Sequence, residues 1–196
     1  MAVGNDWVSA NVKIVETSIP DVVAIDPVVF GDGRGFFMEL FSARRYAAAG
    51  ITHALVQDNL SRSARGVLRG LHFQNPHPQG KLVTTLRGAV LDVAVDVRLG
   101  SPTFGRHVKL ELSEETRRQL WVPRGFAHGF VVISEMAEFF YKCDEFYSPD
   151  DELVLRFDDP ELGIDWGISA PIVSERDRNG KSLSELKGRL PVYEGR

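Results

Sequence analysis

The sequence predicts an all-β protein, an antiparallel jelly-roll barrel with short peripheral helices. Short apolar or alternating runs recur along the 196-residue chain and are separated by glycine and proline, which is typical of β-sandwiches and barrels. Hydrophobic residues make up 43% of the chain and charged residues 26%, as in ordinary globular proteins. No repeat, low-complexity segment or change in composition marks a linker, so we expect one domain over residues 1–196.

The clearest strand is predicted over residues 89–97. The odd-numbered residues from Leu91 to Val97 are apolar and point to one face, whereas Asp92, Ala94 and Asp96 point to the other. This alternation predicts a half-buried strand with the odd-numbered face in the core. It also leaves open that one of the two aspartates lies inside the barrel, as a partner of a site residue.

Shorter elements follow from local signals. Ser42 as an N-cap and Gly50 as a terminator predict a helix over residues 42–49. Ser182 and Glu185 have the spacing of a capping box, which predicts a helix over residues 183–187 before Pro191. Strands are predicted over residues 22–25, 119–122, 126–133 and 137–142, with turns at residues 31–33 and 123–125.

Composition and charge exclude several classes of function. Cys143 is the only cysteine, so no intramolecular disulfide can form and a reducing compartment fits best. The formal net charge is 23 − 27 = −4, without the basic surface that duplex nucleic acid requires. The first ten residues do not resemble a signal peptide, and no apolar run approaches the roughly 20 residues that span a bilayer. We therefore expect a cytoplasmic protein without nucleic-acid or membrane partners.

Polar residues are concentrated in two segments, residues 57–82 and 123–130. The second segment has the Pro-x-Gly-x-x-His spacing of cupins and ends at His128. Metal-binding cupins usually also carry a His-x-His motif with a nearby Glu, but Gln74 stands two residues after His72. His77 lies between two prolines, on a predicted loop. Catalytic zinc generally requires three protein ligands, so a metal site is not expected.

The same segments carry a resemblance to a known family. From about Ile19 to Leu186 the chain resembles the dTDP-4-dehydrorhamnose 3,5-epimerases. The motifs that carry the resemblance occur in order at residues 30–39, 57–59, 66–72, 79–83, 92–96, 101–105, 125–130 and 137–142. The resemblance implies a cupin-type jelly roll that forms a homodimer and acts on dTDP-4-dehydro-6-deoxy-glucose without a coenzyme.

The resemblance also implies roles for individual residues. His72 would be the catalytic base, Asp177 its orienting carboxylate, Tyr141 the acid, and Lys81 the cation beside the developing enolate. Arg34, Phe37 and Glu39 would reach into the site of the partner subunit. The residues that would contact the nucleotide sugar are Arg34, Phe37, Glu39, Gln57, Asp58, Asn59, Arg69, His128, Glu152 and Arg176.

Three parts are expected within the domain. Residues 1–60 would hold N-terminal strands, a helix and the exchanged segment, residues 61–157 the jelly-roll core, and residues 158–196 an extension that carries Asp177. The chain departs from the family pattern at two positions. Phe146 stands where many members have the first of two tyrosines, and Arg176 stands where they usually have lysine, which leaves the preference for sugar and base open.

These residue types suit the inversion of a carbon beside a ketone. Histidine, with an ordinary pKa of about 6.5, can accept a proton at neutral pH, and a carboxylate on its other nitrogen fixes the tautomer. A lysine near the ketone oxygen stabilises the enolate, and a tyrosine with an ordinary pKa near ~10 retains a proton to return. Without the resemblance, each of the four could be structural or solvated. The rival functions are inversion of carbon 3 alone, action on another nucleotide-linked 4-keto sugar, and a non-catalytic cupin.

Overall fold

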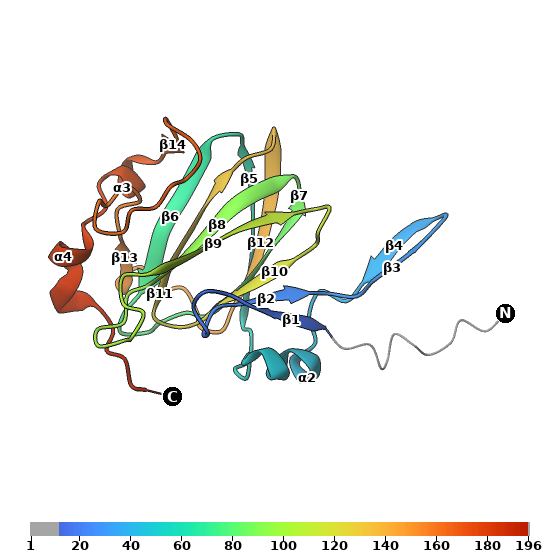
Figure 1. Ribbon diagram of the computed structural model, residues 1–196, viewed down its shortest axis with the longest axis horizontal. Coiled ribbons are helices and arrows are strands. Elements are labelled where there is room, and N and C mark those ends of the chain that lie inside the picture. The colour runs from blue at the N-terminus through green and yellow to red at the C-terminus, as the bar shows by residue number, and fades with distance from the viewer. Residues whose placement is uncertain (1–11, 196) are drawn as a thin grey trace.

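The structure is a computed structural model, and it describes residues 12–195. Two antiparallel sheets pack face to face, as the sequence predicts (Figure 1). The first sheet has the order β1 (Lys13–Glu16), β2 (Val23–Asp26), β10 (Gln119–Val122), β7 (Lys81–Arg87), β12 (Met136–Cys143) and β5 (Gln57–Ala64). The second has the order β13 (Glu152–Val154), β6 (Val67–Gln74), β11 (Phe126–Val132), β8 (Ala89–Asp96) and β9 (His107–Ser113). β14 (Ile172–Val173) adds to β6 in parallel.

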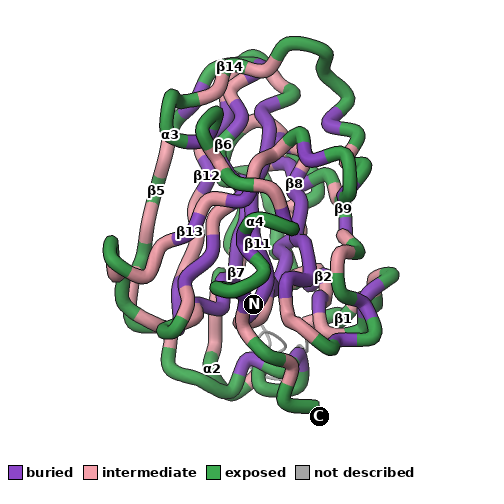
Figure 2. Tube along the Cα trace, turned by 90° about the vertical axis from the view of Figure 1, so that its left-hand side faces the viewer, coloured by how far each residue is buried: buried purple, intermediate pink, exposed green. Residues whose placement is uncertain are grey.

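Apolar side chains from both sheets fill the interior of the sandwich. Alternate residues of each strand point inward, and Val83, Ala94, Leu120, Phe126 and Phe139 are among the buried members of this core. Figure 2 shows the buried residues concentrated along the central strands, while the loops around them are exposed. Burial of this apolar surface is the main favourable contribution to folding.

A second core corrects the prediction for β8. The odd-numbered residues Val93 and Val95 do not face the sandwich interior; they pack with Leu155, Trp166 and Leu186 of the C-terminal segment, on the outer face of the second sheet. The even-numbered face, with Asp92 and Ala94, points into the barrel and is also fully buried. Both faces of the strand are therefore covered, because residues 155–190 fold back over the sheet (Figure 1).

The two predicted helices are short and lie close to their predicted positions. α2 (Ala43–Tyr46) continues as the 3-10 turn η1 (Ala47–Ala49) and ends at Gly50, which has the left-handed φ of 83° that favours glycine. Ser42 stands at the N-cap, but its side chain makes no capping hydrogen bond. α4 (Leu183–Leu186) has the predicted capping box between Ser182 and Glu185. α3 (Glu175–Arg178) and η2 (Lys187–Arg189) are the other helical segments of residues 12–195.

The strands β3 (Val29–Asp32) and β4 (Gly35–Met38) form a separate hairpin. It projects well away from the sandwich (Figure 1). The turn lies at residues 33–34, whereas residues 31–32, predicted as turn, are the end of β3. Phe36 and Phe37 are 55% and 63% exposed, so the hairpin presents apolar side chains to its surroundings.

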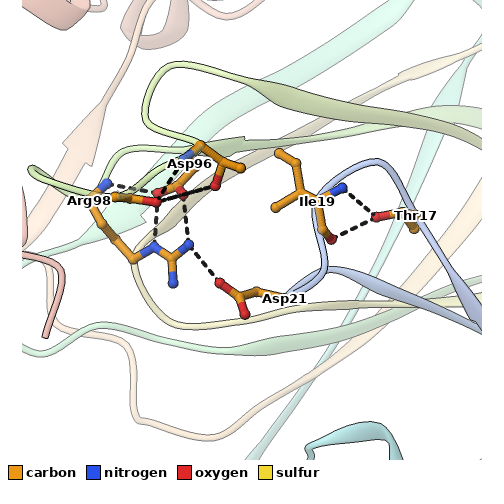
Figure 3. Close-up of polar contacts among 7 residues, drawn as sticks. Thr17, Ile19, Asp21, Asp96 and Arg98 are labelled. Carbon is orange, nitrogen blue, oxygen red and sulfur yellow. Dashed lines mark hydrogen bonds and ion pairs between the residues drawn. The ribbon is translucent and has the colours of Figure 1, made fainter. Parts of the chain in front are cut away.

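The buried carboxylate of Asp96 ties the loop after β8 to the N-terminal segment (Figure 3). It accepts hydrogen bonds from Arg98, Ser101 and Thr103, and the Arg98 guanidinium also donates to Asp21 at 2.9 Å. Burial alone would raise the pKa of Asp96, but these donors hold it below its ordinary value. Removal of one partner from a buried ion pair costs about 3–5 kcal/mol, so this network is a structural element of the fold.

Candidate active site

A cavity of about 570 Å³ opens between the two sheets. Its walls come from strands of both sheets and from the segment that runs through β14 into α3. All four residues to which the resemblance assigns catalytic roles line it, together with four of those expected to contact the nucleotide sugar. These eight are His72, Lys81, Tyr141, Asp177, Asn59, Arg69, His128 and Arg176.

A β-bulge brings Arg69 and His72 to the same wall. In the pairing of β6 with β11, His72 is opposite His128 and Arg69 is opposite Phe130. Two residues of β6 therefore stand opposite one residue of β11, which defines a bulge. Without the extra residue, strand alternation would point positions 69 and 72 to opposite faces.

Glycines on both strands make this bulge possible. A Cβ added to Gly70 would lie 2.6 Å from the Cα of Gly129, and one added to Gly129 would lie 2.6 Å from the carbonyl oxygen of Arg69. Gly70 also has φ +124°, which side chains rarely allow. The Arg-Gly-Leu-His and His-Gly-Phe motifs are thus two halves of one backbone contact.

His72 and Asp177 form a hydrogen-bonded pair at this wall. Their Nε2 and Oδ1 atoms are 2.6 Å apart, and the other oxygen of Asp177 accepts from the Gly70 backbone N–H at 3.2 Å. Burial favours a raised pKa for Asp177, but the hydrogen bond and charge of His72 hold that pKa below its ordinary value. Because Asp177 holds Nε2, the Nδ1 atom of His72 is the nitrogen left to exchange a proton.

Parallel pairing of β14 with β6 places Asp177. Ile172 and Val173 pair with Val67 and Leu68, and Ser174 then caps α3 by accepting a hydrogen bond from the Asp177 backbone N–H. The carboxylate is only 5% exposed. A solvated position, favoured by its charged neighbours in sequence, is therefore wrong for Asp177.

His128 has its own carboxylate partner. Its Nε2 lies 3.0 and 2.9 Å from the two oxygens of Asp92, and Asp92 is fully buried inside the barrel. Of the two aspartates of β8, Asp92 is therefore the one that holds a site residue. His72 and His128 stand side by side on neighbouring strands, each oriented by a carboxylate from another segment.

Tyr141 and Lys81 line the cavity from the first sheet. Tyr141 is opposite Asn59 on β5 and Val83 on β7, and burial raises the pKa of its phenol to about 12. Lys81 begins the central strand β7 and is only 8% exposed. Burial lowers the pKa of its ammonium from the ordinary value, while the nearby Cys143, Glu152, Asp92 and Asp144 raise it. Lys81 is therefore not an exposed charge at a sheet edge.

Further predicted residues lie around the mouth of the cavity. Arg176 forms an ion pair with Glu152, whose Oε2 also accepts from the Tyr147 hydroxyl at 2.6 Å. Gln57 donates to the side chain of Asn59 and accepts from the Tyr147 backbone N–H. Glu152 and Gln57 thus contact wall residues without lining the cavity themselves.

Asp58 and the hairpin residues lie elsewhere within the single chain. Asp58 points to the opposite face of β5 from Asn59 and forms an ion pair with Lys142 at 2.6 Å. Arg34 is almost fully exposed and pairs with Asp32, and Phe37 is exposed on β4. Glu39 pairs with Arg45 of α2. None of these four side chains lines the cavity.

Two aromatic wall residues, Phe130 and Phe139, were not among the predicted site residues. Each lies two positions from a predicted site residue on its strand, His128 and Tyr141 respectively. Strand alternation places residues two apart on one face, so this spacing could have predicted both phenylalanines as wall residues.

Residues 12–195 contain no group of three or more His, Cys, Asp or Glu side chains placed to hold a metal ion. Within the same residues, no helix is long and apolar enough to cross a membrane.

Comparison with known proteins shows the family to which the chain belongs. The family model for dTDP-4-dehydrorhamnose 3,5-epimerase matches residues 16–185. The chain is 54% identical over 175 residues to the dTDP-4-dehydrorhamnose 3,5-epimerase of Pseudomonas aeruginosa, an alignment that covers 88% of this chain and 97% of the relative.

Solved structures are also similar. The dTDP-6-deoxy-D-glucose-3,5-epimerase of Legionella pneumophila, in complex with dTDP-4-keto-L-rhamnose, superposes with a TM-score of 0.90 at 50% identity, over 94% of this chain and 100% of that one. ChmJ, a 3'-monoepimerase from Streptomyces bikiniensis in complex with dTDP-quinovose, gives a TM-score of 0.85 at 35% identity, over 91% and 93%. The chain belongs to the dTDP-4-dehydrorhamnose 3,5-epimerase family.

Proposed function

We propose that this protein inverts carbons 3 and 5 of dTDP-4-dehydro-6-deoxy-D-glucose, on the route to dTDP-L-rhamnose. The observation that carries the proposal is the His72–Asp177 pair, which shares one cavity with Tyr141 and Lys81. These four groups supply a base with its orienting carboxylate, an acid and a cation. An epimerisation beside a ketone requires this set, whereas binding alone does not.

The first step is proton removal from carbon 3. Nδ1 of His72 takes the proton, and the electron pair of the C–H bond moves into an enolate whose negative charge rests on the oxygen at carbon 4. Asp177 stabilises the imidazolium that forms, because its carboxylate holds Nε2 at 2.6 Å. The lowered pKa of Asp177 keeps that carboxylate ionised near neutral pH.

Lys81 stabilises the enolate oxygen. In the part of the chain that the structure describes, no hydrogen bond or ion pair engages its ammonium, although it lies at a buried wall of the cavity. A positive charge in such a water-poor site acts strongly on charge that develops during the reaction. His128, oriented by Asp92, contacts the bound sugar beside it.

Tyr141 returns a proton to the opposite face. Its O–H bond breaks as a new C–H bond forms at carbon 3, and the enolate collapses to the ketone with inverted configuration. The phenolate and imidazolium that remain are reset by proton exchange with solvent, and the cycle repeats at carbon 5. A pKa of about 12 keeps the phenol protonated until the enolate forms.

The second subunit would complete the site. Arg34, Phe37 and Glu39 lie on or beside a hairpin that projects from the sandwich (Figure 1), and none of the three lines the chain's own cavity. The exposed aromatic side chains of β4 suit burial against a partner. A homodimer in which each hairpin reaches the neighbour's cavity accounts for this geometry. The single, buried cysteine fits a cytoplasmic enzyme.

Inversion of carbon 3 alone is the second candidate, because a 3'-monoepimerase is also structurally similar. Incubation of the protein with dTDP-4-dehydro-6-deoxy-D-glucose in heavy water, followed by NMR, distinguishes the two. We expect deuterium and inverted configuration at both carbons. Deuterium at carbon 3 only would assign the monoepimerase activity, and no deuterium at either carbon would overturn the proposal.

A further inference from the structure

The direction of the Tyr141 phenol is not set by a hydrogen bond. Within residues 12–195, no donor or acceptor engages its hydroxyl, in contrast to His72 and His128, which are each held by a carboxylate. Tyr141 packs against the interior core and lines the cavity. The orientation of its ring must therefore come from the side chains that pack against it.

Phe139 is the aromatic side chain that packs on it. The two residues are two positions apart on β12, so they share the inward face. Their ring centroids are 6.2 Å apart with an interplanar angle of 44°. Phe139 is only 1% exposed, so it fills a fixed place in a close-packed interior.

The same ring also contacts the second sheet. It stacks on Phe130 with centroids 4.1 Å apart, and on the His128 imidazole with centroids 6.1 Å apart at 21°. Phe139 therefore lies in contact with two cavity groups from opposite sheets. Loss of its flat ring would free the Tyr141 side chain to adopt other rotamers, while Asp92 would still hold His128.

We propose that Phe139 is a positioning residue that fixes the angle of the Tyr141 phenol relative to the His128 imidazole, and so determines whether a removed proton is replaced on the opposite face. This inference rests on the proposed epimerase function. It predicts that Phe139 acts on the stereochemical outcome of the reaction and not on proton removal, which belongs to His72 at the other wall.

The test is Phe139→Leu, assayed in heavy water for two rates: deuterium incorporation at carbon 3 and inversion at carbon 3. Misplacement of a reacting group by about 1 Å can cost on the order of 10²-fold. We expect inversion to fall by about tenfold or more, while deuterium incorporation stays within about threefold of the native rate. Phe139→Met, which keeps an apolar side chain but lacks a rigid plane, should change the ratio in the same direction and serves if the leucine variant folds poorly.

Phe126→Leu is the matched control. Phe126 is 2% exposed in the same core but does not line the cavity, so this variant should lose stability without a change in the ratio of inversion to exchange. Equal loss of both rates in Phe139→Leu, or the same change in Phe126→Leu, would overturn the positioning role. Absence of both rates in the native protein would instead refute the epimerase function.

Discussion

His72 and Asp177, 105 residues apart in the chain, meet at 2.6 Å through Nε2 and Oδ1. The contact joins β6 of the barrel to α3 of the C-terminal segment. It depends on the bulge at Gly70, whose N–H donates to the same carboxylate. The base therefore has its carboxylate partner only when the C-terminal segment is docked on the barrel.

Asp177→Asn tests this pair. The amide keeps the shape of the side chain but cannot stabilise the imidazolium, so we expect kcat to fall while KM for the substrate changes little. Loss of a properly supported general base costs about 10²–10⁴-fold in rate. A thermal melt checks that the variant is folded, and a kcat within twofold of the native value would show that Asp177 does not support the base.

Lys81→Arg tests whether deprotonation of Lys81 causes the fall in activity that we expect at alkaline pH. Burial lowers the pKa of Lys81, so the ammonium loses its proton as pH rises through a value below the ordinary 10.5, and activity should fall there. Tyr141, with a pKa of about 12, stays protonated over the same range. Arginine does not deprotonate in proteins. The variant should therefore be slower than the native protein, but its activity should not fall over this alkaline range. If the activity of the variant falls over the same alkaline pH range as that of the native protein, the fall must come from another group.

Activity should survive a metal chelator. His72 and His128 each direct Nε2 at a carboxylate, and Gln74 stands where metal-binding cupins place a histidine. We expect kcat to be unchanged after extensive dialysis against EDTA, measured beside an untreated sample. Activity that disappears with EDTA and returns with a divalent cation would establish a metal-dependent reaction.

Hybrid dimers test the shared site. His72→Ala should remove the base, and Arg34→Ala should remove a hairpin residue that serves the neighbouring cavity, so each protein alone should have little activity. A mixture would contain hybrid dimers with one native site and should recover part of the native rate. Recovery is expected only after subunit exchange, which differently tagged chains can verify by co-purification. No recovery with verified exchange would contradict the shared site.

The strands with an apolar inward face were predictable. β10 was predicted at its observed ends, and β8 and β11 were predicted to within one residue, because their periodicity reflects burial. β5 gave no such signal. Two of its inward positions, Asn59 and Ser61, are polar because they line the cavity.

Contacts between distant segments could not be read from local sequence. Asp177 is flanked by charged residues, and its burial depends on the parallel pairing of β14 with β6. Burial of the odd-numbered face of β8 likewise depends on the folding back of the C-terminal segment. The family motifs led to His72, Tyr141, Lys81 and Asp177. The structure adds the geometry, including the bulge that brings Arg69 beside His72.

The central claim is that His72 and Tyr141 act on opposite faces of the sugar, and Tyr141→Phe in heavy water tests it most directly. Without the hydroxyl, His72 can still remove the proton from carbon 3 and return a deuteron to the same face. We predict that deuterium incorporation at carbon 3 persists while inversion falls by about 10²-fold or more, since the general acid is lost. A thermal melt and a dTDP-binding measurement establish that the variant is folded and its site intact. Equal loss of incorporation and inversion in such a protein would contradict the two-face mechanism.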